Sequence, residues 1–598
     1  MAPPARKALQ SEQFKMASPS LRARFRPRDK YLTDDEIQAL LEQSDADLSD
    51  CDDSEWPVND ARDSDTSEEE IDSSDDNGRP VGQPSSQRCL WKTKAFKSVT
   101  IQDNAAEMST EEPKSPYTYF SRYFPGNFWD ECAHQTKLYS VQERAGRSVK
   151  TIAKELRTFA GIHIFMGILK IPRVRMYWSH LLSVDIITDA MSRDRFFELR
   201  SHLHFADRLS VTEEEKKENR LFLVKPVIDC FRKACLELPR SKELCVDEQM
   251  IPFTGRCSMR QCVPSKPNPV GLKNFVLAAS DGLVLDFMIY VGKGTVPDAD
   301  MKELGLGGGV VKRLVETITR DEATFLFTDR YFTGVKVADF LLDNNIFLTG
   351  TIMANRTNGE AARMPNDRSM KRGESHCRVR SDDKLCLVKW KDNKSVLLLS
   401  TAFGTVPEGK CRRWSKDEKK RVEVTQPDIV DKYNQHMGGV DLIDRYVAYY
   451  RITVRSRKWT VRVFTDFLDM ACCNSWIEYQ RDCDNAMVLK KDRLDLLHFK
   501  AVIANVLIQA ESSTARGSRE NAQIDQEPTA KKRTKVIPLP PNEVRYDMTG
   551  HFPEHVKLKF QMKCRNPHCN GKSRVKCTKC HVFLCLQNKN CFLDFHNR

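Results

Sequence analysis

The sequence of 598 residues lacks a long apolar run. Its longest apolar stretch, residues 159–169, contains His163 and ends at Lys170. A membrane-spanning helix needs roughly 20 apolar residues, so we expect no membrane association. The first ten residues, MAPPARKALQ, lack the apolar core of a secretory signal. The 20 cysteines are therefore expected to be reduced thiols or metal ligands rather than a disulfide framework, in the cytosol or nucleus.

Basic residues outnumber acidic ones outside one acidic segment, counted over the rest of the chain as a whole. Residues 31–80 hold 19 acidic and two basic residues, a net charge of −17. Because the whole chain has 95 basic and 83 acidic residues, the remainder has 93 and 64, a net of +29. Dense like charge repels itself and buries little, so residues 1–112 are predicted to be a disordered acidic tail. The basic remainder suggests a body that binds a polyanion.

Hydrophobic periodicity divides the body into parts. Residues 113–240 are mostly helical in pattern, and an α/β pattern covers residues 241–352. We expect strands at 244–247, 275–279, 283–290, 324–328 and 346–350, with helices at 310–318 and 335–343. Three strands followed by a crossover helix and another strand predict a sheet with antiparallel and parallel pairs.

A different composition follows. Residues 353–429 contain a second hairpin pattern and are predicted to be a small β-rich insertion that interrupts the core. Residues 430–451 would complete the core, and residues 452–511 are again helical, with helices expected at about 428–449 and 458–481. Residues 512–550 form a basic, polar linker, and residues 551–598 a compact module rich in Cys and His.

Four aspartates are candidate catalytic residues. Asp247 and Asp329 end predicted strands, where α/β sheets commonly carry ligand-binding groups, and Asp441 lies near a predicted helix start. Asp444 follows Asp441 by three residues and is expected on the same helical face. We find no side chain that would balance these carboxylates, so Mg²⁺ or Mn²⁺ is expected there. Two such cations would suit phosphoryl transfer, although spacing alone leaves ordinary cap or turn roles open.

Three blocks carry a family resemblance. The first combines VDEQ at 246–249, GR at 255–256, PSKP at 264–267 and GLK at 271–273; the second is FTDRYFT at 327–333; the third is YNQHMGGVDLIDR at 433–445. Together with RDRF at 193–196 and HLHFAD at 202–207, these blocks resemble the piggyBac transposases, in order and at suitable spacing. The resemblance covers residues 115–598.

The resemblance implies an RNase H-like catalytic core with Asp247, Asp329 and Asp441 as catalytic metal ligands and Asp444 as a fourth acidic position. The helical parts 113–240 and 452–511 would combine into a dimerisation and DNA-binding domain. The implied activity is cut-and-paste DNA transposition by a homodimer. Strand cleavage at transposon terminal repeats would be followed by hairpin formation and by transfer of the 3′-hydroxyl ends into TTAA targets.

Two positions depart from the family pattern. Arg330 stands where many members have Asn, and Met353 where members often have Arg, while Arg356 remains as a candidate DNA contact. Loss of a cation at Met353 puts efficient target joining in doubt. The alternative function is therefore a domesticated, piggyBac-derived protein that binds DNA or chromatin without transposing. A protein-interaction scaffold is a third possibility.

Basic residues predict further nucleic-acid contacts. Five of them precede or begin a predicted helix and are candidate phosphate contacts: Arg451, Arg455, Arg457, Lys458 and Arg462. A solvated helix face is the alternative. A basic run in the linker, Lys531, Lys532, Arg533 and Lys535, is a candidate nuclear localisation signal, so we expect the protein in the nucleus.

The C-terminal module concentrates metal-ligand types. Seven candidates fall within 33 residues: Cys564, Cys569, Cys577, Cys580, Cys585, Cys591 and His596. One tetrahedral zinc ion needs four ligands, so two zinc ions in a crossed or adjacent arrangement are expected, with His568 or His581 as the eighth ligand. The alternative is a set of free thiols in a disordered tail. The family has a similar module, for which the resemblance implies terminal-repeat recognition.

Overall fold

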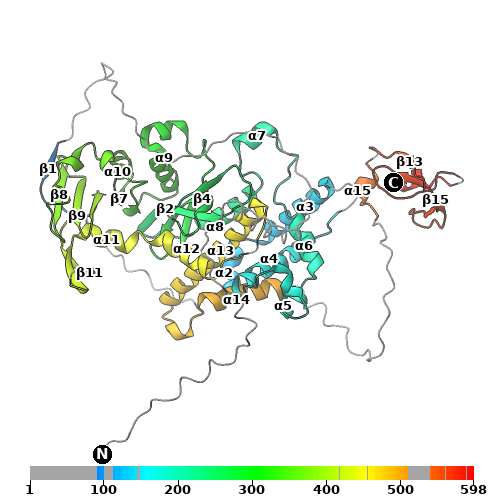
Figure 1. The fold of residues 1–598 in the computed structure, drawn as a ribbon, viewed down its shortest axis with the longest axis horizontal. Helices are drawn as coiled ribbons and strands as arrows, with labels where there is room; N and C mark the ends of the chain where they lie inside the picture. Colours follow the sequence, from blue (N-terminus) through cyan, green and yellow to red (C-terminus); the bar gives the residue numbers. More distant parts are fainter. Residues whose placement is uncertain are drawn as a thin grey trace, which may run out of the picture. The chain divides into compact units, whose positions relative to one another are not determined.

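The computed structural model describes residues 90–99, 112–143, 148–264, 266–415, 418–453, 455–509, 539–547, 549–558, 560–587 and 589–597 (Figure 1). The acidic segment 31–80 and the candidate nuclear localisation signal, Lys531 to Lys535, lie outside these residues. No described helix is long and apolar enough to cross a membrane.

A mixed sheet forms the centre of the body. Its first strands are β2 (Glu243–Pro252), β3 (Arg260–Cys262), β4 (Val270–Ala279) and β5 (Val284–Ile289), and two more are β6 (Thr324–Thr328) and β7 (Ile346–Thr351). β4 pairs antiparallel with both β2 and β5, whereas β6 lies between β2 and β7 and is parallel to each. Every residue of β6 is buried, as expected for a parallel strand covered on both faces. The predicted α/β class is confirmed.

Two helices make the crossovers between these strands. α9 (Asp298–Val315) connects β5 to β6, and α10 (Val335–Leu342) connects β6 to β7. The helix before β6 was expected at residues 310–318, after the three glycines at 307–309, but these glycines lie within α9. A Cβ at Gly307 would meet the Tyr331 carbonyl oxygen at 2.3 Å, so the missing side chains let this helix approach the segment after β6.

The β-rich insertion extends the central sheet. Its strands β8 (Ser375–Arg380), β9 (Cys386–Lys391) and β10 (Ser395–Ser400) continue beyond β7, because β10 pairs antiparallel with β7. The sheet therefore has ten strands in the described residues. β11 (Gly409–Ser415) and β12 (Lys420–Gln426) form a separate hairpin.

The outermost strand of this sheet corrects the predicted extent of the disordered tail. β1 (Trp91–Thr93) pairs antiparallel with β8 within the segment predicted to be disordered. Trp91 and Phe96 are buried there. Two aromatic residues in a basic and polar stretch bury apolar surface that helps to hold the chain against the sheet.

The two helical parts pack against each other. The first contains α2 (Pro116–Tyr123), α3 (Gly126–Glu143), α4 (Ala153–Ile168), η1 (Val174–Trp178), α5 (Asp185–Thr188), α6 (Arg193–His202), α7 (Glu213–Glu218) and α8 (Lys225–Leu236). The second contains α13 (Trp459–Asn485), η4 (Lys490–Asp492) and α14 (Leu496–Gln509). α4 packs on α14 and α2 on α13, so segments far apart in sequence lie side by side (Figure 1). A Cβ at Gly161 of α4 would meet Leu507 of α14 at 2.8 Å.

Short helices lie at the start of the insertion and between its end and the second helical part. η2 (Ala354–Arg356) and η3 (Glu360–Arg363) follow β7, and the predicted helical segment 428–449 forms α11 (Asp428–His436) and α12 (Gly439–Tyr449). A Cβ at Gly439 would lie 2.2 Å from the Ala279 carbonyl oxygen and 2.8 Å from Cys245 Sγ. Glycine therefore brings the start of α12, with Asp441 and Asp444, against β2 and β4.

The C-terminal module has little regular structure. Its elements are α15 (Asn542–Arg545), β13 (Pro553–His555), β14 (Met562–Lys563), β15 (Lys572–Ser573), β16 (Val575–Cys577) and α16 (Cys591–His596). Four of its eight buried core residues are cysteines.

Candidate active site and metal centres

Two predicted aspartates meet where the parallel pairing of β2 and β6 ends. The register pairs Val246 of β2 with Thr328, the last residue of β6, so Asp247 and Asp329 directly follow the last parallel pair. Because β2 continues to Pro252, Asp247 lies within its strand and does not end it as predicted. Oxygens of Asp247, Glu248 and Asp329 all lie within 4.8 Å of one another. The backbone fixes both aspartates, since Asp247 Oδ1 accepts from Glu248 N at 2.8 Å and Asp329 Oδ1 from Tyr331 N at 2.8 Å.

Burial makes these carboxylates reluctant to ionise without a cation. It raises the pKa of Asp247 to about 8, with a further contribution from the charge of Glu248. Burial also raises the pKa of Asp329, and again Glu248 adds to the effect. Three partly buried carboxylates that converge in this way offer hard oxygen ligands to a divalent cation.

Glu248 was missed as a site residue. Successive residues of a strand normally point to opposite faces, so the pattern gave no reason to place Glu248 beside Asp247. In the structure the alternation of buried and exposed residues is interrupted in the middle of β2, where Asp247 and Glu248 are both partly exposed between buried Val246 and buried Gln249. The corresponding signal in the sequence is two adjacent acidic residues at the end of a predicted strand. The longer Glu side chain reaches the same place as the two aspartates.

Asp441 and Asp444 lie differently on α12. The Asp441 side chain is 70% exposed, and it is absent from the carboxylate group formed by the described residues. Asp444 Oδ1 instead accepts from Gln249 Nε2 at 2.7 Å, and burial raises the pKa of Asp444 to about 6. Gln249 also accepts at Oε1 from Asn274 Nδ2 at 3.2 Å. Asp444 therefore fastens α12 to β2 and β4.

Lys266 corrects the expectation that no side chain balances the carboxylates. Its ammonium lies 3.8 Å from Glu248 Oε1 and 4.0 Å from Asp441 Oδ1, and it donates to the Glu248 carbonyl oxygen at 2.9 Å. The side chain is 17% exposed. Although Lys266 belongs to the first motif block, its place between α12 and β2 follows only from the tertiary structure.

The predicted phosphate contacts divide into two groups. Arg451 is buried and donates to Asp466 Oδ1 at 2.6 Å, and Arg462 donates to the carbonyl oxygens of Pro252 and Ile452. These two arginines hold the start of α13 against the core, so their assignment to DNA contact is corrected.

The other predicted contacts are more accessible. Arg455 and Arg457 are exposed, whereas Lys458 is half-buried and donates to the Ser201 carbonyl oxygen. Arg356 is exposed, and its Nη1 donates to the Tyr331 carbonyl oxygen at 2.7 Å. Arg356 thus braces the loop after Asp329.

The C-terminal module gathers two groups of four ligand atoms. One group contains Cys564, Cys569, Cys585 and Cys591, and the other contains His551, Cys577, Cys580 and His596. Within each group the ligand atoms lie within 4.8 Å of one another. The pairs alternate along the chain between the two groups, so the arrangement is crossed, one of the two alternatives that the spacing left open.

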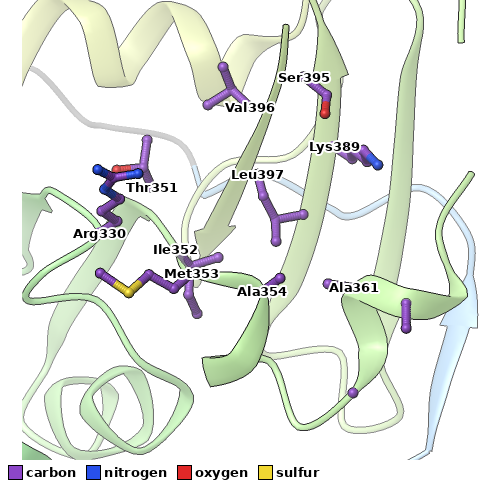
Figure 2. A pocket seen from close by; sticks show the side chains of 12 residues that line it. Arg330, Thr351, Ile352, Met353, Ala354, Ala361, Lys389, Ser395, Val396 and Leu397 are labelled. Carbon is purple, nitrogen blue, oxygen red and sulfur yellow. The ribbon is translucent and has the colours of Figure 1, made fainter. Parts of the chain in front are cut away.

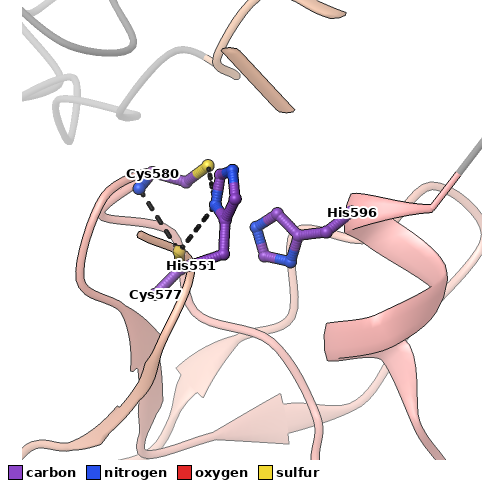
Figure 3. Close-up of side chains that lie close together, drawn as sticks. All are labelled: His551, Cys577, Cys580 and His596. Carbon is purple, nitrogen blue, oxygen red and sulfur yellow. Dashed lines mark hydrogen bonds between the residues drawn. The ribbon is translucent and has the colours of Figure 1, made fainter. Parts of the chain in front are cut away.

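His551 takes the place for which His568 and His581 were the candidates. Its Nδ1 lies 3.4 Å from both Cys577 Sγ and Cys580 Sγ, and its ring also lies beside the His596 ring (Figure 3). His551 Nε2 lies 3.0 Å from the Val544 carbonyl oxygen and 3.0 Å from Asp547 Oδ1. A proton on Nε2 would satisfy both acceptors and leave Nδ1 free for a metal. His551 precedes Cys564 by 13 residues, farther than any two successive ligands of the other seven are apart, so the ligand spacing did not point to it.

The donor set fits zinc. His596 Nδ1 donates to the Phe592 carbonyl oxygen at 2.8 Å, which leaves a buried Nε2 without a hydrogen-bond partner. The Gly571 amide lowers the pKa of Cys569 to about 7 and a hydrogen bond from Cys580 lowers that of Cys577, whereas burial raises the pKa of Cys585 and Cys591. An unpartnered imidazole nitrogen beside clustered cysteine sulfurs is a donor set that zinc commonly binds.

Comparison with known proteins agrees with this class of site. Residues 115–476 match the family described as Transposase IS4. This range includes the carboxylates, the helices of the first helical part and every strand of the central sheet except β1, and it ends within α13 of the second helical part. The chain belongs to this family and, within it, to the piggyBac transposases, as the motif blocks indicated.

Named relatives make the relationship more specific. The chain is 28% identical over 524 residues to human PiggyBac transposable element-derived protein 2, covering 84% of this chain and 80% of the relative. It is 26% identical over 522 residues to human PiggyBac transposable element-derived protein 3, covering 85% and 81%. The fold resembles that of the piggyBac transposase in a synaptic complex with hairpin DNA, with a TM-score of 0.57 and 21% identity over 79% of this chain and 96% of that chain.

Proposed function

We propose that the protein is a cut-and-paste DNA transposase that cleaves and joins DNA strands by metal-dependent phosphoryl transfer. The observation that carries this proposal is the convergence of Asp247, Glu248 and Asp329 where the parallel pairing of β2 and β6 ends, in a chain of the transposase family. The strand order β5-β4-β2-β6-β7, with its antiparallel and parallel halves, supports an RNase H-like core.

The carboxylates would hold Mg²⁺ or Mn²⁺. When bound, a pair of such cations activates the attacking oxygen and stabilises the leaving oxygen of an in-line displacement. Asp247 would supply a ligand from within β2 and Asp329 from directly after β6, and their partial burial limits competition from water. Asp441 would join them through a small movement of its exposed side chain, while Asp444 keeps α12 in place through Gln249.

The proposed reaction begins with cleavage at the transposon ends. The freed 3′-hydroxyl would attack the opposite strand and form a hairpin, and the reopened ends would then join TTAA targets. A relative's synaptic complex with hairpin DNA supports this order. The same site would serve each step, since every step is a phosphoryl transfer with no covalent protein intermediate.

The C-terminal module would bind two zinc ions and contact the terminal repeats. Residues 557–598 contain ten basic residues and one acidic residue, Asp594, which suits a phosphate backbone. We further propose that the protein works as a homodimer in the nucleus, where its substrate is double-stranded DNA. The basic run from Lys531 to Lys535 supports the location.

Excision from a donor plasmid tests the proposal. A library of candidate terminal repeats would flank the marker, and excised and integrated products would be counted for the wild type and Asp329→Asn. We expect excision to fall by at least about a thousandfold, because a metal ligand that stabilises transition-state charge is lost. Asp343→Asn, an exposed aspartate after α10, is the matched control and should leave excision unchanged.

The second candidate is a domesticated protein that binds DNA without transposing. The names of the human relatives, which describe them as derived from transposable elements, favour it, as does Met353 in place of a cation. Repeat binding without excision in the wild type would select this candidate. Excision without integration would indicate a defect in target joining around Met353.

A further inference from the structure

A cavity of about 760 Å³ adjoins the carboxylate site and has no assigned role. It lies between the segment that follows β7 and the hairpin of β9 and β10, where the insertion joins the core (Figure 2). Its lining includes Arg330, Thr351, Met353, Lys389, Val396 and Leu397. Cavities of this size commonly hold a ligand of nucleotide dimensions.

One positively charged side chain of the cavity lining is Arg330. Arg330 follows Asp329 directly and has an exposed side chain. Its guanidinium makes no hydrogen bond or ion pair with any residue that the structure describes. An exposed arginine that lines the cavity without a partner among the described residues is available for an external anion, and its planar fork suits a phosphate.

The remaining walls are mostly apolar. Figure 2 shows Arg330, Thr351 and Met353 gathered on one side, Leu397 in the middle, and Lys389 on the other. Val396 is exposed to 36%, although it is a large aliphatic residue. Aliphatic walls with a few polar groups at the edge suit a flat heteroaromatic ring, whose faces are apolar and whose rim is polar.

Hydroxyl groups connect this cavity with the reaction site. Thr351 Oγ1 lies 3.5 Å from the Tyr433 hydroxyl. The charges of Asp329, Asp247 and Asp441 contribute to raising the pKa of Tyr433 to about 12, after the larger effect of burial. Tyr433 therefore lies near Thr351 of the cavity lining and within reach of the charges of the carboxylates, so the cavity and the reaction site are neighbours.

We propose that this cavity binds one unpaired nucleotide next to the scissile phosphodiester, with its phosphate on Arg330 and its base between Met353 and Leu397. This inference rests on the proposed function and adds the form of DNA that the site accepts. A duplex cannot place a base between these walls without extruding it, at a cost of a few kcal/mol. Single-stranded or locally melted DNA would therefore bind better than duplex DNA.

Binding of the full-length protein to a short single strand tests the proposal. The strand carries a fluorescent adenine analogue, Ca²⁺ replaces Mg²⁺ to prevent cleavage, and a duplex of the same sequence is measured in parallel. We expect Arg330→Gln to weaken single-strand binding about tenfold and to reduce the slope of log affinity against log salt by about 0.7. Ala354→Phe, at an exposed position in the cavity lining, should abolish the fluorescence change of the analogue and keep the salt slope.

Arg363→Gln is the matched control. Arg363 lies in η3, pairs with Glu360 at 2.7 Å and is 64% exposed, but it does not line the cavity. It should leave single-strand binding and the fluorescence change as in the wild type. An equal loss for Arg363→Gln and Arg330→Gln, or an equal loss with the duplex, would show a general basic surface and overturn the proposal.

The remaining outcomes separate this inference from the proposed function. Cleavage is measured separately with Mg²⁺ in place of Ca²⁺. If the wild type binds and cleaves DNA, and Arg330→Gln and Ala354→Phe bind the single strand as the wild type does, the cavity has no such role and the transposase proposal stands. If the wild type binds neither DNA form and cleaves none, the proposed function fails and the nucleotide site fails with it.

Discussion

The carboxylate site and the C-terminal module are both candidate metal centres, yet they depend on the fold in opposite ways. The eight Cys and His ligands of the module fall between residues 551 and 596, whereas Asp247, Asp329 and Asp441 are spread over almost 200 residues. The module gathers its candidate ligands locally, and we expect it to need metal to become rigid. The carboxylates are brought together by the central sheet, which we expect to fold without metal.

The difference follows from the apolar surface each region buries. The buried non-cysteine core of the module consists of Val582, Leu584, Phe592 and Phe595, and its strands have two or three residues each. A domain of this size rarely folds without metal or disulfides. The core around the carboxylates contains a fully buried strand, β6, between two parallel neighbours.

Zinc removal should produce the largest difference in stability between the C-terminal module and the central sheet. A zinc-selective chelator is expected to unfold residues 539–597 and leave the sheet intact, because structural zinc contributes about 10 kcal/mol or more in small zinc-binding peptides. Hydrogen exchange would show loss of amide protection in the module alone. Protection that persists in metal-free protein would mean that the module folds through its apolar core.

His551→Ala should separate the two zinc positions. We expect one zinc ion to remain bound tightly in the four-cysteine group and the other to bind at least about 100-fold more weakly, since a first ligand and its link to Asp547 are both lost. Zinc content and chelator competition measure this. The control is His581→Ala, which removes the same side chain outside both groups; an equal effect of both variants would contradict the assignment.

Metal affinity at the carboxylates should rise with pH. Burial raises the pKa of Asp247 to about 8, so a cation must displace a proton below that pH, and Mn²⁺ affinity should increase about tenfold per pH unit between roughly 6 and 8. The stability of the metal-free protein should change with pH in the opposite direction. The folded state favours the protonated form of Asp247, so this contribution to the free energy of unfolding is lost as the pH rises towards 8.

Calorimetric titration with Mn²⁺ and thermal unfolding in buffer without added divalent cations check both parts of this prediction. Asp247→Asn should remove most of the pH dependence. The zinc module does not interfere if no chelator is added. A pH-independent Mn²⁺ affinity in the wild type would show that Asp247 is ionised in the free protein.

Lys266→Met should have the smallest effect. Removing an ammonium within 4.0 Å of Glu248 and Asp441 should strengthen Mn²⁺ binding by up to about tenfold, because the cation no longer competes with a fixed positive charge. Lys293→Met, an exposed lysine before α9, is the control. Weaker Mn²⁺ binding by the Lys266 variant would show that the lysine positions the carboxylates rather than competing with the metal.

The sequence predicted the regular part of the core well. Alternating and continuous apolar runs located β2, β4, β5, β6 and β7 and the helix α10, since each run buries one or both of its faces. Periodicity could not show that the insertion joins the same sheet, because the register between β7 and β10 depends on which strand edge is free. It also missed β1, whose two buried aromatics stand in a polar segment.

Charged residues were predicted less well than apolar ones. A basic cluster before a helix has the same pattern whether it faces solvent or an acidic partner. Arg451 is buried beside Asp466, which lies about two helical turns inside α13, and the sequence does not reveal that contact. Glu248 and Lys266 likewise acquire their places at the site only through the pairing of β2 with its neighbours.

The sequence by itself indicated the family and the α/β class, and it supplied Asp247, Asp329 and seven of the eight clustered Cys and His residues as candidate ligands. These features depend on local periodicity, motif order or short ligand spacing. Only the tertiary structure decided that Glu248 and Lys266 join the aspartates, that His551 completes the second metal group, and that Arg330 faces a cavity. The physical reason is that side-chain partners far apart in sequence are chosen by packing and register, which a linear pattern does not encode.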